Sequence, residues 1–522
     1  MDSGGAASVE MLYVLDRQVI CPIMARPILK PTGLIFDQFL QRKAKRMGME
    51  FLAAQGTGGT VLCHEIAWRD PFDAAQRLAE RPGFAFLDSA LPHESLGRYS
   101  YIGIEPFGVF SSIAGQTTWN GTRLAEPPLE ALRRLLTQFA FEPVAGVPPF
   151  RGGAIGAIPY DFGWRLDGLE LRDRPHPEGR DPLHFSFYDL VLAFDHAERR
   201  AFIFSSGFPE TDLLKRQARA VQRLDEILAA LEKAPASARG LPPISGWISN
   251  FTQAAYHAAV EQVRTHILDG DIYQANISQR FTTKLPDGFS AFAFYAALRA
   301  ANPAPFAAYL TCGDIVIASS SPELLLRKRG GDIETRPIKG TIARSPDEAE
   351  DALRRESLLA SEKDRAENIM IVDLLRNDLS RVSEPFSVQV PILCGLESYA
   401  GVHHLVSVVT GHLSPGKDAV DLIATCFPGG SITGAPKRRA MQIIAAIEQI
   451  PRGYYCGAIG YLGFDGAMDL NIAIRTAVMK DGEVQIQAGG GITRLSEPQA
   501  EYDETFAKVK RLFAAFSESQ TK

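Results

Sequence analysis

The sequence predicts an α+β protein made of large antiparallel sheets with helices packed outside them. Three observations carry this prediction. Residues 61–192 consist mostly of short apolar runs of strand length. Longer stretches with helical periodicity follow, and further strand-like runs lie between the helices of the second half. The chain also shows no evident repeat and no low-complexity tract.

The composition is that of a folded protein that does not bind nucleic acid. The chain has 522 residues, 46% of them hydrophobic, which is enough to bury one large core or two to three smaller ones. A formal net charge of -6 and a pI near 6.0 argue against a nucleic-acid partner. Six cysteines are scattered without a C-x-x-C pair or a zinc-ligand spacing. We read them as reduced thiols in a cytoplasmic protein.

The first 48 residues fit the rest of the sequence poorly. Charged residues interrupt the apolar stretch 11–29, so it is expected neither to span a membrane nor to act as an export signal. A basic run at 42–46 precedes Met49, and regular patterning starts only near Thr60. Our hypothesis is that Met49 is the working start and that residues 1–48 form a leader without an assigned role.

In the first half, the clearest strand-like runs lie at 84–87 and 190–194, and a helical pattern covers residues 212–231. Residues 233–243 are small and rich in proline, which indicates a linker. The predicted organisation is therefore an N-terminal subdomain at 49–232, a linker or a crossing loop at 233–245 and a second domain at 246–522.

The second half opens with a predicted helix at 252–268, with Tyr256 and Val263 on one stripe and Gly270 as its stop. Further helices are predicted at 347–379 and 498–516. The strands predicted between them are 272–281, 309–319, 457–464, 473–479 and 484–488.

Lys339 is the first candidate for chemistry, in the segment RPIKGT at 336–341. It lies between the ring-constrained Pro337 and Gly340, where the backbone can turn and approach a ligand. Burial disfavours the charged form of a lysine and so makes a neutral nucleophilic amine available. The alternative is a loop lysine that pairs with a nearby carboxylate.

Carboxylates are expected on two helices. Glu501, Glu504 and Lys508 follow each other at spacings of three and four, so they share one helix face. Glu367 stands next to an apolar run, an unusual place for an unpaired carboxylate. Glutamates from separate helices, together with water and a substrate carboxylate, would suit Mg²⁺. The alternative is a solvated charged face with one ion pair.

Two glycine-rich segments do not match nucleotide-binding motifs. Segment 429–437 has Ala435 and Pro436 where a phosphate-binding loop requires lysine and serine or threonine, and segment 489–491 lacks the third glycine of a dinucleotide fingerprint. Their backbone amides could still hold anionic oxygens, and Arg475 could clamp a carboxylate. We therefore predict a small polyanionic ligand, with tight turns and a surface arginine as the alternative.

A set of motifs occurs in one order along the chain: PIKGT at 337–341, DRAEN at 364–368, HLVS at 404–407, the loop 428–437, IRT at 474–476, AGGG at 488–491 and ETF at 504–506. Together they resemble the chorismate-utilising enzymes, the family of the anthranilate, isochorismate, salicylate and aminodeoxychorismate synthases. The resemblance spans roughly residues 61–516 and implies the fold of that family. Within it, lysine before Gly340 is similar to the branch that leads to p-aminobenzoate and folate, whereas anthranilate synthases usually carry alanine there.

The resemblance implies a substrate and roles for several residues. Chorismate would be bound through Mg²⁺ held by Glu367 and Glu504, with Glu501 acting through water. Lys339 would attack carbon 2 while Glu323 protonates the departing 4-hydroxyl group. Ammonia would then add at carbon 4 and expel Lys339, which gives 4-amino-4-deoxychorismate.

The resemblance also implies a substrate-binding set and a role for His404. Gln274 stands where water-using relatives carry a lysine base, and an amide cannot deprotonate water. His404 is expected near the substrate ring as a catalytic residue, with a core histidine as the alternative. The other residues expected to bind substrate are Thr433, Gly434, Tyr455, Arg475, Gly489, Gly490, Gly491 and Lys508.

A second site is implied where relatives bind tryptophan, with plain core packing as the alternative. The residues that correspond to this pocket are Ser89, Arg98, Tyr99, Pro305 and Phe306.

Two other functions remain open from the sequence. One is an anthranilate synthase component, with amination at carbon 2, and the other is an inactive tryptophan-binding regulatory subunit. No segment offers the Cys-His-Glu apparatus of a glutamine amidotransferase. Ammonia is therefore expected from a separate amidotransferase subunit or from solution.

Overall fold

The computed structural model describes residues 49–52, 61–91, 96–166, 169, 181–235, 241–399 and 401–517. The predicted leader 1–48 lies outside these residues, as do residues 236–240 of the predicted linker. No helix within the described ranges is long and apolar enough to cross a bilayer.

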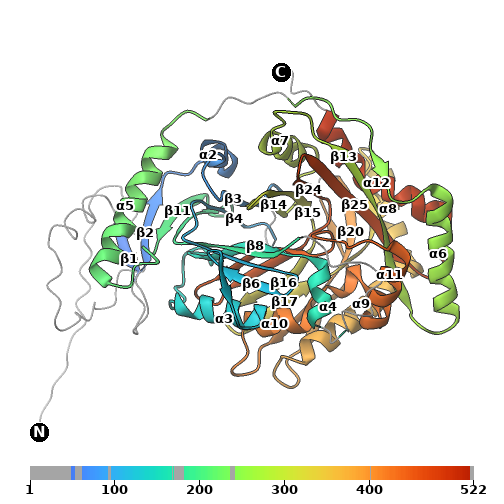
Figure 1. Cartoon of the computed structure of the whole chain (residues 1–522). Helices are drawn as coiled ribbons and strands as arrows, with labels where there is room; N and C mark the ends of the chain where they lie inside the picture. The colour runs from blue at the N-terminus through green and yellow to red at the C-terminus, as the bar shows by residue number, and fades with distance from the viewer. Residues whose placement is uncertain are drawn as a thin grey trace, which may run out of the picture. The chain divides into compact units, whose positions relative to one another are not determined.

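Two antiparallel sheets form the centre of the fold (Figure 1). The first has the spatial order β1 (Met49–Leu52), β2 (Val61–Ile66), β11 (Arg200–Ser205), β10 (Leu190–Asp195), β4 (Tyr99–Gly103), β3 (Ala85–Asp88), β14 (Phe306–Cys312), β15 (Ile315–Ser321), β24 (Thr476–Lys480), β25 (Glu483–Ile492), β13 (Gln274–Lys284) and β12 (Ile248–Ser249), with β21 (Gly434–Ala435) paired to β13. The second has the order β18 (Ile338–Ala343), β20 (Val402–His412), β17 (Asp332–Arg336), β16 (Leu324–Arg329), β23 (Met468–Ile472), β22 (Ala458–Gly463), β8 (Gly153–Ile158), β9 (Leu183–Tyr188), β5 (Gly108–Ile113), β6 (Gln116–Trp119) and β7 (Thr122–Leu124), with β19 (Gln389–Ser398) paired to β20.

Strand β10 shows how the sheets are buried. Leu190, Leu192 and Phe194 belong to one apolar core, while Val191 and Ala193 belong to another. Because successive side chains of a strand point to opposite faces, this strand is covered on both sides. One core lies between the two sheets, and the other lies between the first sheet and its outer helices. The predicted α+β class is confirmed.

The helices cover the sheets from outside (Figure 1). Helix α5 packs on β2 and β11, and α2 packs against α5 and β4. Helix α7 packs on β15, α12 on β25, and α9 on β18 and β20. The described helices are α2 (Pro71–Leu78), α3 (Pro128–Gln138), α4 (Gly163–Leu166), α5 (Leu213–Leu231), α6 (Gln253–Leu268), α7 (Ala291–Ala301), α8 (Glu348–Ala360), α9 (Glu362–Ser380), α10 (Ala419–Cys426), α11 (Lys437–Glu448) and α12 (Pro498–Ser517).

Local signals place several helix ends correctly. Asp212 caps α5 by accepting from the backbone N–H of Lys215, and Thr252 caps α6 in the same way. Gly270 has a φ of +81°, which suits the left-handed turn that follows α6. The predicted helices 212–231, 252–268 and 498–516 are thus confirmed within one or two residues.

Three predicted elements are wrong. The strand 309–319 is a hairpin of β14 and β15, which turns at Gly313 with a φ of +67°. The helix 347–379 is two helices, because Ser361 takes an extended conformation and caps α9 through its side chain. The strand 473–479 begins only at Thr476, since Arg475 has a φ of +52° and lies outside it.

The strand predicted at 272–281 begins and ends later, as β13 (Gln274–Lys284). The predicted division at 233–245 separates no independent core. Both sheets contain strands from both sides of it, and the described residues between 49 and 517 form one compact unit. The physical reason is that β3 pairs with β14 and β8 pairs with β22, so the backbone hydrogen bonds of each half are completed by the other.

Candidate active site

A cavity of about 290 Å³ gathers most of the predicted catalytic, metal and substrate residues. They come from β18, α9, β20, α12, the end of β25 and the loops before β16, β22 and β24. The predicted residues on its wall are Glu323, Lys339, Glu367, His404, Tyr455, Arg475, Gly489, Gly491, Glu501, Glu504 and Lys508. Residues that are far apart in sequence therefore share one site.

Lys339 lies in this wall on β18 as one half of an ion pair. Its Nζ is 2.8 Å from Oε1 of Glu367 and donates to the carbonyl oxygen of Ser431 at 2.8 Å. Burial opposes the lysine charge, but Glu367 and the more distant carboxylates Glu323 and Glu504 outweigh it and raise the pKa of Lys339. The expectation that burial leaves this amine neutral is therefore wrong, and Lys339 is an ammonium paired with Glu367.

Glu323 is a buried residue that contacts Ser431 through the serine hydroxyl, whereas Lys339 contacts the carbonyl oxygen of the same serine. Its Oε1 accepts from the Ser431 hydroxyl at 2.7 Å and from the backbone N–H of Ile338 at 3.5 Å. Burial raises the pKa of Glu323, although the Ser431 hydrogen bond and the charge of Lys339 act in the other direction. A carboxyl group with a raised pKa is suited to donate a proton. Ser431 thus connects the predicted acid to the predicted nucleophile.

Gly491 of β25 makes room for a hydrogen bond between the side chains of Gln274 and Glu367. Gln274 donates from Nε2 to Oε1 of Glu367 at 2.6 Å. A Cβ at Gly491 would lie 1.9 Å from that Nε2 and 2.5 Å from that Oε1. Only glycine therefore fits beside the Gln274–Glu367 pair. The other amide atom, Oε1 of Gln274, is buried and has no hydrogen-bond partner within the described part of the chain.

We expect Gly491→Ala to disturb the site without unfolding the protein. The added methyl group must displace the Gln274 amide or the Glu367 carboxylate. A misplaced group of this kind is expected to lower kcat/KM by about 10²-fold. Steady-state kinetics and circular dichroism would check this. The control is Gly482→Ala, which adds a Cβ where nothing lies within 4 Å and, since Gly482 has a φ of +72°, strains only a turn that does not line the cavity. Equal kinetics in both variants would contradict the prediction.

The carboxylates of α12 face the same cavity. Glu504 pairs with Lys508 at 2.6 Å, and Glu501 lies 3.5 Å from Nζ of Lys363. Burial, and then the neighbouring Glu504 charge, raise the pKa of Glu501 above its ordinary value. In Glu504 burial acts upward, but Lys508 outweighs it and the pKa is lowered. The helical spacing thus puts both carboxylates and Lys508 on one face, as predicted.

These carboxylates form a donor set for a hard cation. Within the described residues no group of three or more His, Cys, Asp or Glu side chains is close enough to hold a metal unaided. Mg²⁺ does not need such a group, because it keeps several waters and takes one or two carboxylates plus substrate oxygens. Glu367 and Glu504 line one cavity from different helices, α9 and α12. The residues present fit the predicted ion.

Arg475, a cation, and His404, a neutral imidazole, both line the cavity. Arg475 donates to the carbonyl oxygen of Lys508 at 3.0 Å, and burial lowers its pKa. Burial, and to a smaller degree the Arg475 charge, lower the pKa of His404 to about 4. Nδ1 of His404 is 2.7 Å from the Thr341 hydroxyl oxygen. His404 is therefore a neutral imidazole near neutral pH.

Some predicted residues do not line the cavity, and some lining residues were missed. The Thr433 hydroxyl bonds to the carbonyl oxygens of Gly429 and Gly430, and Gly434 pairs with β13, so both shape the loop behind the wall. Gly490 does not line the cavity but lies next to the Glu501 carboxylate, since a Cβ at Gly490 would be 3.0 Å from Oε2 of Glu501. The missed lining residues include Ser431, inside the glycine-rich loop, and Asn276, on the same strand face as Gln274. The spacing of two residues from Gln274 along that strand was the signal for Asn276.

A second cavity, of about 340 Å³, contains every residue of the predicted tryptophan pocket. Ser89, Arg98, Tyr99, Pro305 and Phe306 all line it. The Arg98 guanidinium is turned to the carboxylates of Asp195 and Glu198. Additional lining comes from Tyr101, Tyr461, Arg327, Arg329, Asp469 and Asn471.

This fold, with two antiparallel sheets and a cavity of lysines, glutamates and bare glycine amides, defines a chorismate-utilising enzyme. The family model of chorismate binding enzymes matches residues 84–514, and the chain belongs to this family. It is similar to aminodeoxychorismate synthase component 1 of Klebsiella aerogenes, with 39% identity over 86% of this chain and 97% of the relative. It is nearly as similar to anthranilate synthase component 1 of Streptomyces coelicolor, with 38% identity over 84% of each.

Solved structures agree with the fold. Anthranilate synthase component I from Streptococcus pneumoniae superposes with a TM-score of 0.70 at 33% identity, and covers 81% of this chain and 94% of that one. The menaquinone-specific isochorismate synthase from Escherichia coli superposes with a TM-score of 0.67 at 21% identity, over 92% of this chain and 99% of that one.

Proposed function

We propose that this chain aminates chorismate at carbon 4, the reaction of an aminodeoxychorismate synthase component 1, in the synthesis of p-aminobenzoate and folate. The observation that carries this proposal is the position of Lys339. Its amine lies in the cavity wall, bonded to Glu367 and linked through Ser431 to the buried acid Glu323. Relatives of both the aminodeoxychorismate and the anthranilate branch are about equally similar, so this lysine, rather than overall identity, favours the first branch.

The residues of the chain account for the steps as follows. The Lys339 ammonium first loses its proton to water, because only the neutral amine is a nucleophile. The amine then attacks carbon 2 of the ring while Glu323 protonates the departing 4-hydroxyl group. Ammonia adds at carbon 4 and the bond to Lys339 breaks, so the enolpyruvyl group is retained. Arg475 and the β25 amides hold the substrate carboxylates during both steps.

Mg²⁺ is the cofactor that we propose, with Glu367 and Glu504 as its ligands and Glu501 acting through water. When bound, it supplies positive charge that holds the ring carboxylate and withdraws electrons from the conjugated system. We propose a glutamine amidotransferase subunit as the source of ammonia, since the relatives named component 1 imply a second component.

The test is incubation with chorismate, Mg²⁺ and ammonium, followed by chromatography of the product. We expect 4-amino-4-deoxychorismate. Anthranilate with release of pyruvate would instead identify an anthranilate synthase component. Absence of any turnover under these conditions would favour an inactive regulatory subunit.

Glu323→Gln is expected to lower kcat by about 10²- to 10⁴-fold, the usual contribution of a general acid. Since burial raises the pKa of Glu323, its acid form persists to higher pH than in an ordinary glutamate. The wild-type kcat should therefore decline as pH rises through this raised pKa, and the variant should lack that decline. A pH series of kcat for both proteins checks this, and an unchanged decline in the variant would assign it to another group.

We also propose that the second cavity binds tryptophan. Its aromatic lining, from Tyr99, Tyr101 and Tyr461, suits an indole, and the Tyr101 hydroxyl has no partner among the residues that the structure describes. We expect L-tryptophan to raise the melting temperature, with a stabilisation of about 2.7 kcal/mol at a hundred times Kd. Scanning calorimetry with L-phenylalanine as the matched control tests this, and equal melting temperatures with and without tryptophan would refute it.

A further inference from the structure

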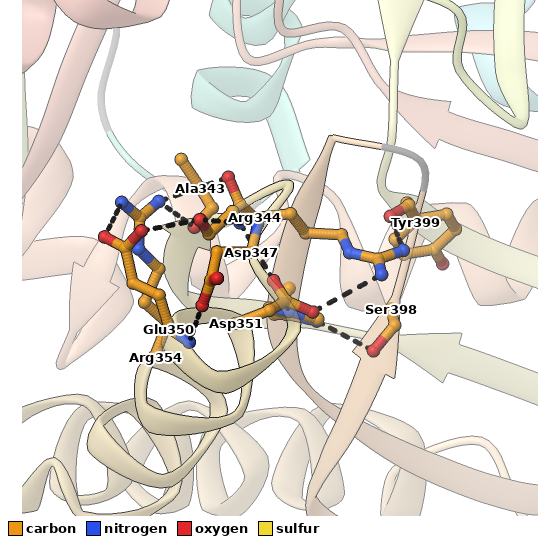
Figure 2. Close-up of polar contacts among 10 residues, drawn as sticks. Ala343, Arg344, Asp347, Glu350, Asp351, Arg354, Ser398 and Tyr399 are labelled. Carbon is orange, nitrogen blue, oxygen red and sulfur yellow. Dashed lines mark hydrogen bonds and ion pairs between the residues drawn. The ribbon is translucent and has the colours of Figure 1, made fainter.

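Outside both cavities, the Asp351 carboxylate, the His403 imidazole and the Ser398 hydroxyl group form a hydrogen-bonded chain. Oδ1 of Asp351 is 3.0 Å from Nε2 of His403, and Nδ1 of His403 is 2.7 Å from Oγ of Ser398. Figure 2 shows Asp351 on its helix opposite Ser398. Asp351 belongs to α8, whereas Ser398 and His403 are paired residues of β19 and β20. These three groups stand in the order that activates a serine nucleophile, with the two imidazole nitrogens exchanged relative to a serine protease.

The bonds around Asp351 decide which nitrogen of His403 carries the proton. The Asp351 carboxylate accepts from the backbone N–H of Ser345 at 2.9 Å and from the Arg344 guanidinium at 3.3 Å. The Ser345 bond, opposed by burial and aided by His403, lowers the pKa of Asp351 to about 2. An ionised carboxylate only accepts, so the proton of His403 lies on Nε2. Nδ1 therefore has a lone pair directed at the Ser398 hydroxyl.

A reactive serine must be accessible to its substrate, while its general base must be held in a fixed position. Ser398 is exposed at the end of β19, while His403 is 1% exposed and so is held in one position. The Arg344 guanidinium lies beside them, where it also donates to the carbonyl oxygen of Tyr399 (Figure 2). Its contacts with Asp351 and Tyr399 use two of its five N–H groups, and its side chain is 40% exposed. Arg344 can therefore face the negative charge that develops on the acyl oxygen when Ser398 attacks.

We propose that Ser398 is a nucleophile that accepts an acyl group from small activated esters, with His403 as its general base. The bond between Oγ and the acyl carbon forms as the ester C–O bond breaks. The hydroxyl proton passes to Nδ1 of His403 and then to the departing oxygen. Because His403 and His404 are neighbours on β20, they point to opposite faces, and only His404 lines the chorismate cavity. The acylation site is thus separate from the proposed amination site.

The experiment treats the full chain with p-nitrophenyl acetate and, separately, with a fluorophosphonate, and locates the adduct by peptide mass spectrometry. The control is Ser357, an exposed serine of α8 in the same protein. We expect Ser398 to react at least about tenfold faster than Ser357, and the rate to fall at least about tenfold in His403→Gln and in Asp351→Asn. Equal labelling of the two serines, or an unchanged rate in His403→Gln, would overturn the proposal.

Since His403 and Asp351 are buried, their substitution can unfold the chain, and Ser398→Ala gives a second test. This variant removes an exposed hydroxyl group and should keep the melting temperature while it loses the adduct and the burst of p-nitrophenolate. A burst that persists in folded Ser398→Ala would place the reactive group elsewhere and refute the assignment.

Discussion

Lys339→Ala is expected to lower the rate of chorismate amination by at least about 10³-fold, because the variant lacks the nucleophile that opens the reaction. The loss should appear in kcat rather than in KM, since the cavity keeps Arg475 and the glycine amides that hold the carboxylates. Product formation with ammonium as the nitrogen source, followed by chromatography, measures it directly.

A matched variant separates nucleophilicity from charge. Lys339→Arg keeps a cation opposite Glu367 but stays protonated at any working pH. If Lys339 acts only as a countercharge, the arginine variant should retain most of the activity that the alanine variant loses. We expect both variants to be inactive. Turnover in Lys339→Ala within about tenfold of wild type would remove covalent catalysis by this lysine from the mechanism.

Arg452→Leu is expected to destabilise the protein by about 3 to 5 kcal/mol, the usual cost of leaving one member of a buried ion pair alone. Arg452 and Glu448 are 1% and 2% exposed and 2.7 Å apart. The arginine also donates to the carbonyl oxygens of Ile432 and Asn276, which belong to the loop and the strand that back the cavity. Loss of this residue should therefore reduce both stability and activity. Urea unfolding gives the free energy of unfolding from the transition midpoint.

The control for this prediction is an exposed ion pair on α9. The side chains of Arg376 and Asp373 are 52% and 81% exposed, so Arg376→Leu should change the free energy of unfolding by no more than about 1 kcal/mol. A double variant, Arg452→Leu with Glu448→Leu, should recover part of the loss, because it leaves no buried charge. If Arg452→Leu costs no more than the control, the buried pair is not what holds the loop against the strand.

Features that depend on short stretches of sequence were predicted well. The face shared by Glu501, Glu504 and Lys508 follows from the helical repeat, and α12 confirms it. The helices predicted at 212–231 and 252–268 are likewise local, and the structure shows Asp212 and Thr252 capping them through a backbone N–H three residues on. The break between α8 and α9 was missed because no glycine or proline interrupts residues 347–379, although Ser361 and Asp364 have the S-x-x-D spacing of a helix start.

The chemical state of Lys339 could not be predicted in this way. Burial alone predicts a lowered pKa, but the folded chain brings Glu367 to 2.8 Å, and Coulomb attraction at that distance outweighs the loss of water. The role of Ser431 also depends on the folded structure, because Ser431 is 92 residues from Lys339 and 108 residues from Glu323 along the chain. Neither contact can be predicted from the spacing of residues near each other in the sequence.

The sequence by itself determined the fold class, the helices with strong periodicity and the residue types needed for the chemistry, because these depend on neighbours within a few turns of the chain. Only the tertiary structure decided that both halves share two sheets, that Arg475 precedes its strand in a left-handed conformation, and that Lys339 is an ammonium paired with Glu367. The reason is that strand pairing and charge interactions depend on distances through space, which residues far apart in sequence acquire only when the chain folds.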